Sequence, residues 1–338
     1  MTAPQVEIAP GYHVSRLIKG GWQTIGRGPE VVEDLLHFVA AGVTTFETSD
    51  SYAGGEELMG ALRAAARDRL AAETFAALRL HTRYTAPLSG SGPTPSDVTR
   101  SVERSLQRLG VERLDLVQIQ WWNLDVPGLI DTALVLADLQ QQGKIGLIGT
   151  ANFGMATLER LAAAGVPIAT NQVHYSLIDR RAENGLAQYC ASRGIGLMTF
   201  APLAGGFLSE RWLSGDDPRA TGTEHSAEYR ALIDAGGGWQ RHRKLLGALD
   251  GVARRCGCPV ATVALAWVLQ YGPGAALLFG ASSAARLPEI LKALDVVITA
   301  EDRIAIEDAG LARPMLDVGD IERAPDSPLM RAIHAQHS

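Results

Sequence analysis

The segment FETSDSY, residues 46–52, places carboxylates, hydroxyls and a phenol within seven positions. The carboxylate of Glu47 can act as a general base where burial raises its pKa, and the phenol of Tyr52 can donate a proton. Arg83, further along the chain, can hold an anion or pair with Glu47 through two parallel hydrogen bonds. These three side chains can do chemistry together only if the fold brings them to one place.

The elements that must position them follow a regular pattern, in which a short apolar run precedes a helix many times over. Helical spacing of apolar residues and a cap at Thr94 mark the clearest helix, which starts at Pro95. Eight strands are expected to start near Leu17, Val43, Leu78, Leu114, Ile145, Ile168, Ile195 and Ala276. Eight strand and helix pairs predict an α/β fold, the closed parallel (β/α)8 TIM barrel.

An open doubly wound sheet is the weaker alternative, because no Gly-x-Gly-x-x-Gly follows the first strand. We expect one barrel domain over residues 1–338. A polar, glycine-rich insertion is expected at about 205–240, after the seventh strand, and an irregular tail at about 312–338.

Polar residues at the carboxyl ends of barrel strands gather around one site. This rule makes the predicted strand ends into candidates: Trp22, Glu47, Tyr52, His81, Arg83, Gln118, Gln120, Trp121, Trp122, Asn123, Ala151, Asn152, Asn171, Gln172, Phe200 and Gly280 to Ser283. Each alone has a structural reading, as an ion pair, a packed ring or a loop hydrogen bond. Together they favour a site with a phenol, a carboxylate, a guanidinium and an amide.

Six segments, in this order and at these separations, resemble the aldo-keto reductases: FETSDSYAGGEELMG, LDLVQIQWW, GKIGLIGTANF, TNQVHYSL, TFAPLAGGFLS and FGASSAARLPEI. The resemblance covers about Leu17 to Ala309. It implies a (β/α)8 barrel that binds a nicotinamide cofactor, usually NADPH, without a Rossmann domain. It also implies a catalytic set of Asp, Tyr, Lys and His.

Only one member of that catalytic set keeps its residue type in this chain. The aspartate position falls on Glu47, the tyrosine on Tyr52, the lysine on Arg83 and the histidine on Gln120. The resemblance implies that Tyr52 gives a proton to a carbonyl oxygen. Arg83 and Glu47 preserve the charge pattern of the pair that activates this tyrosine, whereas Gln120 can donate a hydrogen bond but cannot change its charge.

The resemblance also implies a set of cofactor contacts. Asn152, Asn171 and Gln172 match the contacts to the nicotinamide amide, with Ala151 in place of a serine, and Phe200 matches an aromatic ring that stacks on the nicotinamide. The remaining expected contacts are Pro202, Leu203, Gly280, Ser282, Ser283, Arg286 and Glu289. Ser282, Ser283 and Arg286 suit a ribose that carries a 2′-phosphate. Ile290 stands where the family commonly has an asparagine that contacts adenine.

Three functions follow from these residues. The first is an NADPH-dependent oxidoreductase with Tyr52 as proton donor, acting on a specialised small-molecule substrate. The second is a non-redox dehydratase, cyclase or isomerase that uses Glu47 or Tyr52 as acid or base. The third is a binding or regulatory protein with little catalysis. The number of cofactor-site residues that match places the oxidoreductase first.

The composition of the chain bears on which binding partners to expect. The formal net charge is -6, and apolar residues make up 46% of 338 residues. This mild negative balance gives no reason to expect nucleic acid or an anionic membrane. No apolar run is long enough to span a bilayer and the start does not read as a signal peptide, so we expect a cytoplasmic protein. The oligomeric state is open.

Two further groups of side chains complete the predictions. Trp22, Trp121 and Trp122 are expected to line the substrate pocket. The three cysteines and the histidines His81 and His174 show no metal-ligand spacing, so no metal is expected.

Overall fold

The computed structural model describes residues 2–28, 30–214, 224–312, 317–323, 327 and 331. The chain divides into two compact units. Unit 1 comprises Met1–Val173, Gln188–Met198 and Ala275–Leu287, and unit 2 comprises His174–Ala187, Thr199–Gly274 and Pro288–Ser338. The single domain expected over residues 1–338 stays a prediction.

Eight strands close into a barrel in the order β10-β3-β4-β5-β6-β7-β8-β9, which confirms the predicted fold class. Their bounds are β3 (Leu17–Gly20), β4 (Thr45–Glu47), β5 (Arg79–Thr85), β6 (Leu114–Gln120), β7 (Ile145–Ala151), β8 (Ile168–His174), β9 (Gly196–Phe200) and β10 (Ala276–Phe279). The strand expected near Val43 begins two residues later, because the amide of Val43 bonds to the carbonyl of Phe38 at the end of the preceding helix.

A hairpin of β1 (Gln5–Ala9) and β2 (Tyr12–Ser15) precedes the barrel and was not predicted. The amide of Ser15 donates to the hydroxyl of Thr45, the first residue of β4. The carbonyl of Ile8 lies against Gly196, the first residue of β9, so closely that an added Cβ would be 1.8 Å from it. The hairpin therefore packs at the amino ends of the strands, away from the ends that carry the candidate site.

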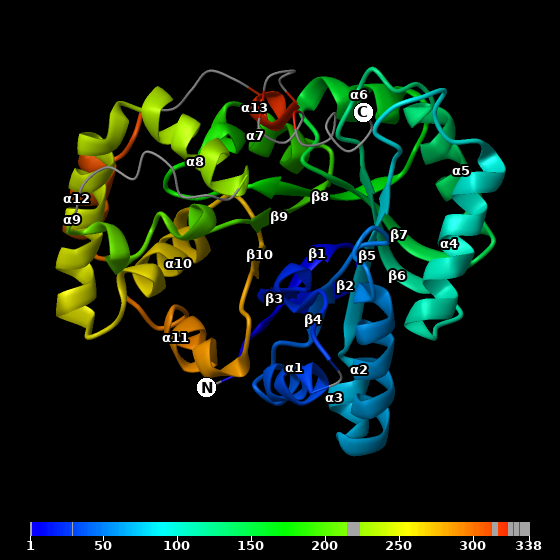
Figure 1. Ribbon diagram of the computed structural model, residues 1–338, viewed down its shortest axis with the longest axis horizontal. Helices are drawn as coiled ribbons and strands as arrows, with labels where there is room; N and C mark the ends of the chain where they lie inside the picture. The colour runs from blue at the N-terminus through cyan, green and yellow to red at the C-terminus, as the bar shows by residue number, and fades with distance from the viewer. Residues whose placement is uncertain are drawn as a thin grey trace. The chain divides into compact units, whose positions relative to one another are not determined.

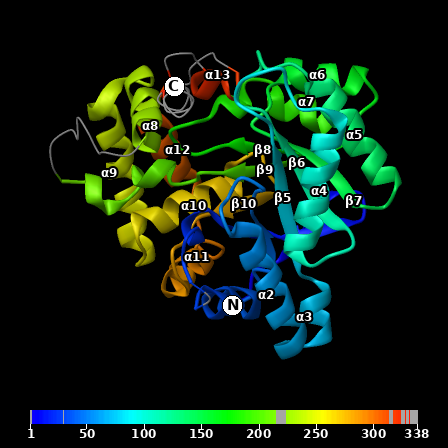
Figure 2. The same ribbon diagram turned by 45° about the vertical axis from the view of Figure 1, so that its right-hand side comes forward.

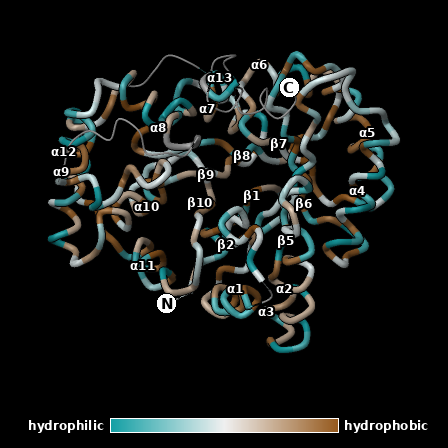
Figure 3. The backbone as a smooth tube through the Cα atoms, viewed as in Figure 1, coloured by the Kyte–Doolittle hydropathy of each residue, from teal (hydrophilic) through white to brown (hydrophobic). Residues whose placement is uncertain are grey.

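The helices of unit 1 follow its strands along the chain: α1 (Val31–Ala40), α2 (Gly55–Arg69), α3 (Ala72–Ala76), α4 (Pro95–Leu109), α5 (Leu129–Gln141) and α6 (Met155–Ala163). Both views show α2, α4 and α5 outside the strands (Figures 1 and 2). Hydrophobic and hydrophilic stretches alternate along α4 and α5 in Figure 3, as expected for helices with one buried face.

The predicted start of α4 is confirmed in detail. Thr94 caps the helix by accepting from the amide of Asp97, and the side chain of Asp97 accepts from the amide of Thr94. Pro95 occupies the first turn, and Gly110 ends the helix with a φ of 65°. The buried face includes Ser101 and Ser105, whereas Leu106 is only half-buried.

Four of the remaining helices belong to unit 2: α8 (Glu224–Ala235), α9 (Gly238–Cys256), α10 (Val260–Tyr271) and α12 (Ala300–Ala309), together with the short α13 (Asp320–Arg323). Two span the division, α7 (Leu186–Ser192) and α11 (Leu287–Lys292). Among the described residues, no single helix is long and apolar enough to cross a membrane. The pair α9 and α10, bent by 97°, passes that test only when both are counted together.

The insertion expected at about 205–240 contains α8 and short 3-10 turns at Ala204–Gly206 and Glu210–Trp212, while residues 215–223 lie outside the described part. Within the tail expected at about 312–338, the described residues include α13 and the single residues 327 and 331.

Candidate functional site

Glu47 and Arg83 form a buried ion pair at the carboxyl ends of β4 and β5. Their side chains are 2% and 9% exposed, and Nη2 of Arg83 contacts Oε1 of Glu47. Side chains alternate along a strand, and Thr82 donates to Glu56 on α2, outside the barrel. Arg83 must therefore face the barrel interior, which is where it meets Glu47.

Tyr52 lies in the loop between β4 and α2. Its hydroxyl accepts a hydrogen bond from Nη1 of Arg83 at 3.3 Å. Asp50 holds this loop in place, because its carboxylate accepts from the amide of Thr85 at 3.1 Å and from the hydroxyl of Ser101 at 3.1 Å. The carboxylate of Asp50 therefore has a positioning role, and the phenol beyond it reaches Arg83.

Gln120 ends β6 and joins the same group. Nη1 of Arg83 donates to Oε1 of Gln120 at 3.2 Å. Since a guanidinium has only donors, this bond fixes which way the amide points, with its oxygen toward Arg83 and its nitrogen on the other side. The structure thus brings together all four residues predicted as the catalytic set.

Burial dominates the protonation behaviour of this group. It raises the pKa of Tyr52 to about 12, although Arg83 acts to lower it. Burial also raises the pKa of Glu47, with Arg83 and Lys19 opposing the rise. The pKa of Arg83 would fall through burial alone, but Glu47 and Tyr52 outweigh that effect and raise it. Tyr52 and Arg83 therefore keep their protons throughout the neutral range.

Lys19 on β3 is a charged neighbour that the sequence analysis missed. It is 1% exposed, its Nζ donates to the carbonyl of Gly20 at 2.5 Å, and the ammonium lies 5.9 Å from the ring centroid of Phe38. Burial lowers its pKa to about 8. A lysine inside an apolar strand was the available signal, since lysine is almost never fully buried without a reason.

The side-chain amides of Asn171 and Gln172, near the end of β8, differ in whether they can still bond to a ligand. Asn171 bonds within the protein on both sides, because Oδ1 accepts from Thr150 at 2.9 Å and Nδ2 donates to the carbonyl of Phe153 at 2.9 Å. Gln172 accepts from Nε2 of Gln118 at 3.0 Å, and its own Nε2 is buried with no hydrogen-bond partner among the described residues. Gln172 therefore offers a donor to a ligand, whereas Asn171 holds the loop after β7.

That loop begins with Asn152, which adopts a φ of 58°. Asparagine tolerates this left-handed conformation better than most residues. The amide of Asn152 donates to the carbonyl of Gln172 at 2.7 Å, so the two predicted contacts are neighbours. Ala151 before it is buried at the end of β7.

The residues expected to contact the 2′-phosphate of the cofactor follow β10. Ser282 and Arg286 are exposed and Ser283 is half-buried. Nη1 of Arg27 donates to the carbonyl of Ser282, and the amide group of Gln23 lies against Gly280. Two hydroxyls and a guanidinium thus lie on one short exposed segment. Ile290, in unit 2, is 6% exposed and belongs to the core.

Four predicted cofactor residues belong to unit 2. Phe200 is half-buried and stacks on the ring of His174 with centroids 4.0 Å apart. Pro202 is buried and Leu203 half-buried, and the carbonyl of Glu289 accepts from Thr262 at 3.2 Å. Ala201, just after Phe200, has a φ of 58°, which is strained for an alanine and is typical of functional loops.

The three predicted pocket tryptophans do not share one environment. Trp22 is 52% exposed and places its ring edge-on to Tyr52 with centroids 5.2 Å apart. Trp122 is half-buried. Trp121 is 1% exposed and donates to the carbonyl of Val126 at 3.1 Å, so it packs in the interior and does not present a face to a substrate.

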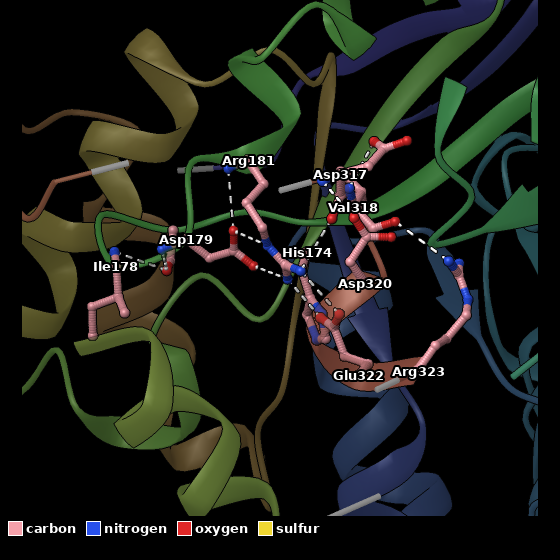
Figure 4. A network of polar contacts seen from close by, with 10 residues as sticks. His174, Ile178, Asp179, Arg181, Asp317, Val318, Asp320, Glu322 and Arg323 are labelled. Carbon is pink, nitrogen blue, oxygen red and sulfur yellow. Dashed lines mark hydrogen bonds and ion pairs between the residues drawn. The ribbon is translucent and has the colours of Figure 1, made fainter. Parts of the chain in front are cut away.

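His174 has acidic neighbours that the sequence spacing did not indicate. Ligand atoms of His174, Asp179 and Glu322 lie within 4.8 Å of one another. The guanidinium of Arg181 lies among them, with Nη2 2.7 Å from Asp179 and 2.7 Å from Glu322 (Figure 4). This arginine already supplies the positive charge that the carboxylates need, so the cluster is a salt-bridge network.

The closed parallel barrel carries a half-buried tyrosine, a buried ion pair and amides at the carboxyl ends of its strands. The sequence model of the Aldo/keto reductase family matches residues 16–310, so the chain belongs to this family. It is an enzyme that binds a nicotinamide cofactor and a small-molecule substrate.

Individual relatives agree with this assignment. "Uncharacterized oxidoreductase Rv2298" of Mycobacterium tuberculosis is 30% identical, covering 89% of this chain and 91% of that protein. "NADH-specific methylglyoxal reductase" of Escherichia coli is 25% identical, covering 86% of this chain and 92% of that protein.

Solved structures give the same result. The thermostable aldo-keto reductase Tm1743, in complex with the inhibitor epalrestat, superposes with a TM-score of 0.70 at 26% identity, covering 91% of this chain and all of that chain. The glycerol dehydrogenase AKR11B4 from Gluconobacter oxydans has a TM-score of 0.73 at 22% identity, over 91% of this chain and 95% of that chain, a likeness of fold alone.

Proposed function

We propose that this oxidoreductase reduces a carbonyl group with NADPH, and that Tyr52 donates the proton. The observation that carries the proposal is that one nitrogen of Arg83 contacts both the hydroxyl of Tyr52 and the amide oxygen of Gln120. A reduced nicotinamide bound here would supply hydride to the carbonyl carbon. The carbonyl oxygen would then gain its proton from the hydroxyl of Tyr52.

The group offers donors to a substrate and withholds acceptors. The oxygen of Tyr52 accepts from Arg83, so its proton is free to point elsewhere. The oxygen of Gln120 is also used by Arg83, which leaves its two N–H donors. Two donors that converge on one oxygen favour a carbonyl whose charge grows during reduction.

Glu47 is poorly placed for the non-redox alternative. A raised pKa would suit a general base, but the side chain is 2% exposed and is paired with Arg83. A substrate proton cannot come within hydrogen-bond reach of a carboxylate that is buried behind a guanidinium. Glu47 instead holds Arg83 in the orientation that serves Tyr52 and Gln120.

The cofactor preference is the finer part of the proposal. The unpartnered buried Nε2 of Gln172 suits the carbonyl of a nicotinamide amide, since a buried donor without a partner costs about 1–3 kcal/mol until a ligand satisfies it. Ser282, Ser283 and Arg286 suit a 2′-phosphate, which favours NADPH. The Escherichia coli relative is named as NADH-specific, so relatives of this chain do not all share one preference.

A fluorescence titration tests the proposal directly. Purified protein should enhance and saturate the nicotinamide fluorescence of NADPH, with a lower Kd than for NADH. A panel of aldehydes and ketones should then oxidise bound NADPH over many turnovers. No binding at millimolar cofactor, or product formation by protein stripped of cofactor, would overturn it.

A further inference from the structure

Glu322, on the tail helix α13, reaches a buried network in unit 2 (Figure 4). Its side chain is 3% exposed. Its Oε1 accepts from Nδ1 of His174 at 2.6 Å, and its two oxygens accept from Nη2 and Nη1 of Arg181 at 2.7 and 3.0 Å. One carboxylate near the end of the chain thus holds two side chains that lie about 140 positions earlier in the sequence.

Arg181 is fixed so completely that it can act as an anchor. Its guanidinium donates to both oxygens of Asp179 at 2.9 and 2.7 Å and to both oxygens of Glu322. The fifth N–H points to the carbonyl of Asp317 at 3.4 Å. A planar fork with every donor occupied leaves Glu322 little freedom to move.

His174, which Glu322 holds in place, contacts Phe200. The imidazole stacks on the ring of Phe200 at 4.0 Å with an interplanar angle of 26°. On another side it meets the ring of Tyr229 edge-on at 6.1 Å. Phe200 is half-buried and the imidazole occupies one face of its ring, so a second flat ring would have to stack on the other face.

We propose that Glu322 is a positioning residue for the nicotinamide ring, acting through His174 and Phe200. The proposal rests on the proposed function and on the expectation, from the family resemblance, that the nicotinamide stacks on Phe200. Glu322 orients the imidazole through the bond to Nδ1, and the imidazole sets the plane of the phenyl ring. A carboxylate in the tail thereby governs how well a ring is held at the end of β9.

The test compares two ligands that differ in the nicotinamide. NADPH carries the ring, and 2′-phospho-ADP-ribose lacks it but keeps the adenine, the ribose phosphates and the pyrophosphate. Calorimetric titration of Glu322→Ala should show a Kd for NADPH raised roughly tenfold, while the Kd for 2′-phospho-ADP-ribose changes less than about twofold. A selective loss of this kind requires that Glu322 act on the ring.

Two further variants separate positioning from a general loss of structure. Glu322→Gln keeps an oxygen that can accept from His174, so it should recover most of the NADPH affinity. Asp308→Ala removes an exposed acid from another helix of unit 2, α12, and both Kd values should stay at wild-type levels. His174→Ala combined with Glu322→Ala should cost no more than His174→Ala alone, since both act through one ring.

Three results would overturn the proposal. In the first, Glu322→Ala weakens both ligands equally, which would make Glu322 a general stabiliser of the fold. In the second, Glu322→Ala leaves both affinities unchanged, as the control Asp308→Ala does. In the third, the wild-type protein binds neither ligand, and this result alone would also overturn the proposed function.

Discussion

The guanidinium of Arg83 donates to the phenol oxygen of Tyr52 over 3.3 Å, inside the barrel and beside the carboxylate of Glu47. This bond places a permanent positive charge next to the proposed proton donor, so that negative charge developing on the phenol oxygen during transfer is stabilised. A guanidinium therefore fills the position of a lysine while keeping its link to an acidic partner.

Tyr52→Phe removes the proposed proton donor and little else. We expect kcat to fall by about 10²- to 10⁴-fold, the range for a positioned acid, with NADPH affinity within about twofold of wild type. Steady-state kinetics measure kcat, and fluorescence titration measures the Kd for NADPH. Tyr84→Phe is the matched control, because Tyr84 lies on β5 on the opposite face from Arg83 and is also buried. Unchanged kcat in Tyr52→Phe would rule out its role.

Gln120→His should introduce a titration that the wild-type site lacks. Burial raises the pKa of Tyr52 to about 12, and Glu47 keeps Arg83 protonated, so neither titrates near neutrality. Free histidine titrates at about 6.5, and the charge of Arg83 should lower that value. The ratio of variant to wild-type kcat/KM should rise as pH falls through the imidazole pKa, because the protonated ring polarises a carbonyl more strongly.

Dividing by the wild-type profile removes contributions from other groups, such as Lys19 with its pKa of about 8. A ratio that stays flat from pH 5 to 8 would mean that position 120 does not contact the reacting oxygen.

Arg286→Ala should affect NADPH much more than NADH. A charge-assisted bond to a phosphate contributes about 1.5–3 kcal/mol, which corresponds to roughly a ten- to hundredfold increase in the Kd for NADPH. The Kd for NADH, which lacks the 2′-phosphate, should change less than about twofold. Arg254→Ala, on the surface of α9, removes another exposed arginine and should change neither value. Equal losses for both cofactors in Arg286→Ala would place the 2′-phosphate elsewhere.

Gly196→Ala should destabilise the protein, since the added methyl group would lie 1.8 Å from the carbonyl of Ile8 in the hairpin. Relieving this overlap by moving β1 should cost at least about 1–3 kcal/mol, measured by urea denaturation. Gly247→Ala lies inside α9, where no described atom would be within 4 Å of the new methyl, so it should instead gain about 0.5–1 kcal/mol. Equal effects at the two positions would contradict the close packing of the hairpin.

The alternation of strands and helices could be predicted from the sequence because it depends on residues that are close together in the chain. Apolar runs, glycine stops and the Thr94 cap act within a few residues, and they predicted eight strands that the barrel confirms. The hairpin was missed because Gln5–Ala9 and Tyr12–Ser15 are only five and four residues long. Its pairing depends on contacts with Thr45 and Gly196, which no local pattern reveals.

The residue types alone state which chemical groups the strand ends carry, including the phenol of Tyr52 and an arginine, Arg83, at the position of the family's lysine. The folded chain sets which of those groups can still bind a ligand. In the folded chain the side-chain amide of Asn171 donates to the carbonyl of Phe153. Nε2 of Gln172 has no hydrogen-bond partner among the described residues, and Oε1 of Gln120 points toward Arg83. The folded chain also joins Glu322 to His174, 148 positions apart. Residue type fixes what a side chain can donate or accept, but its partners are set by packing between distant segments.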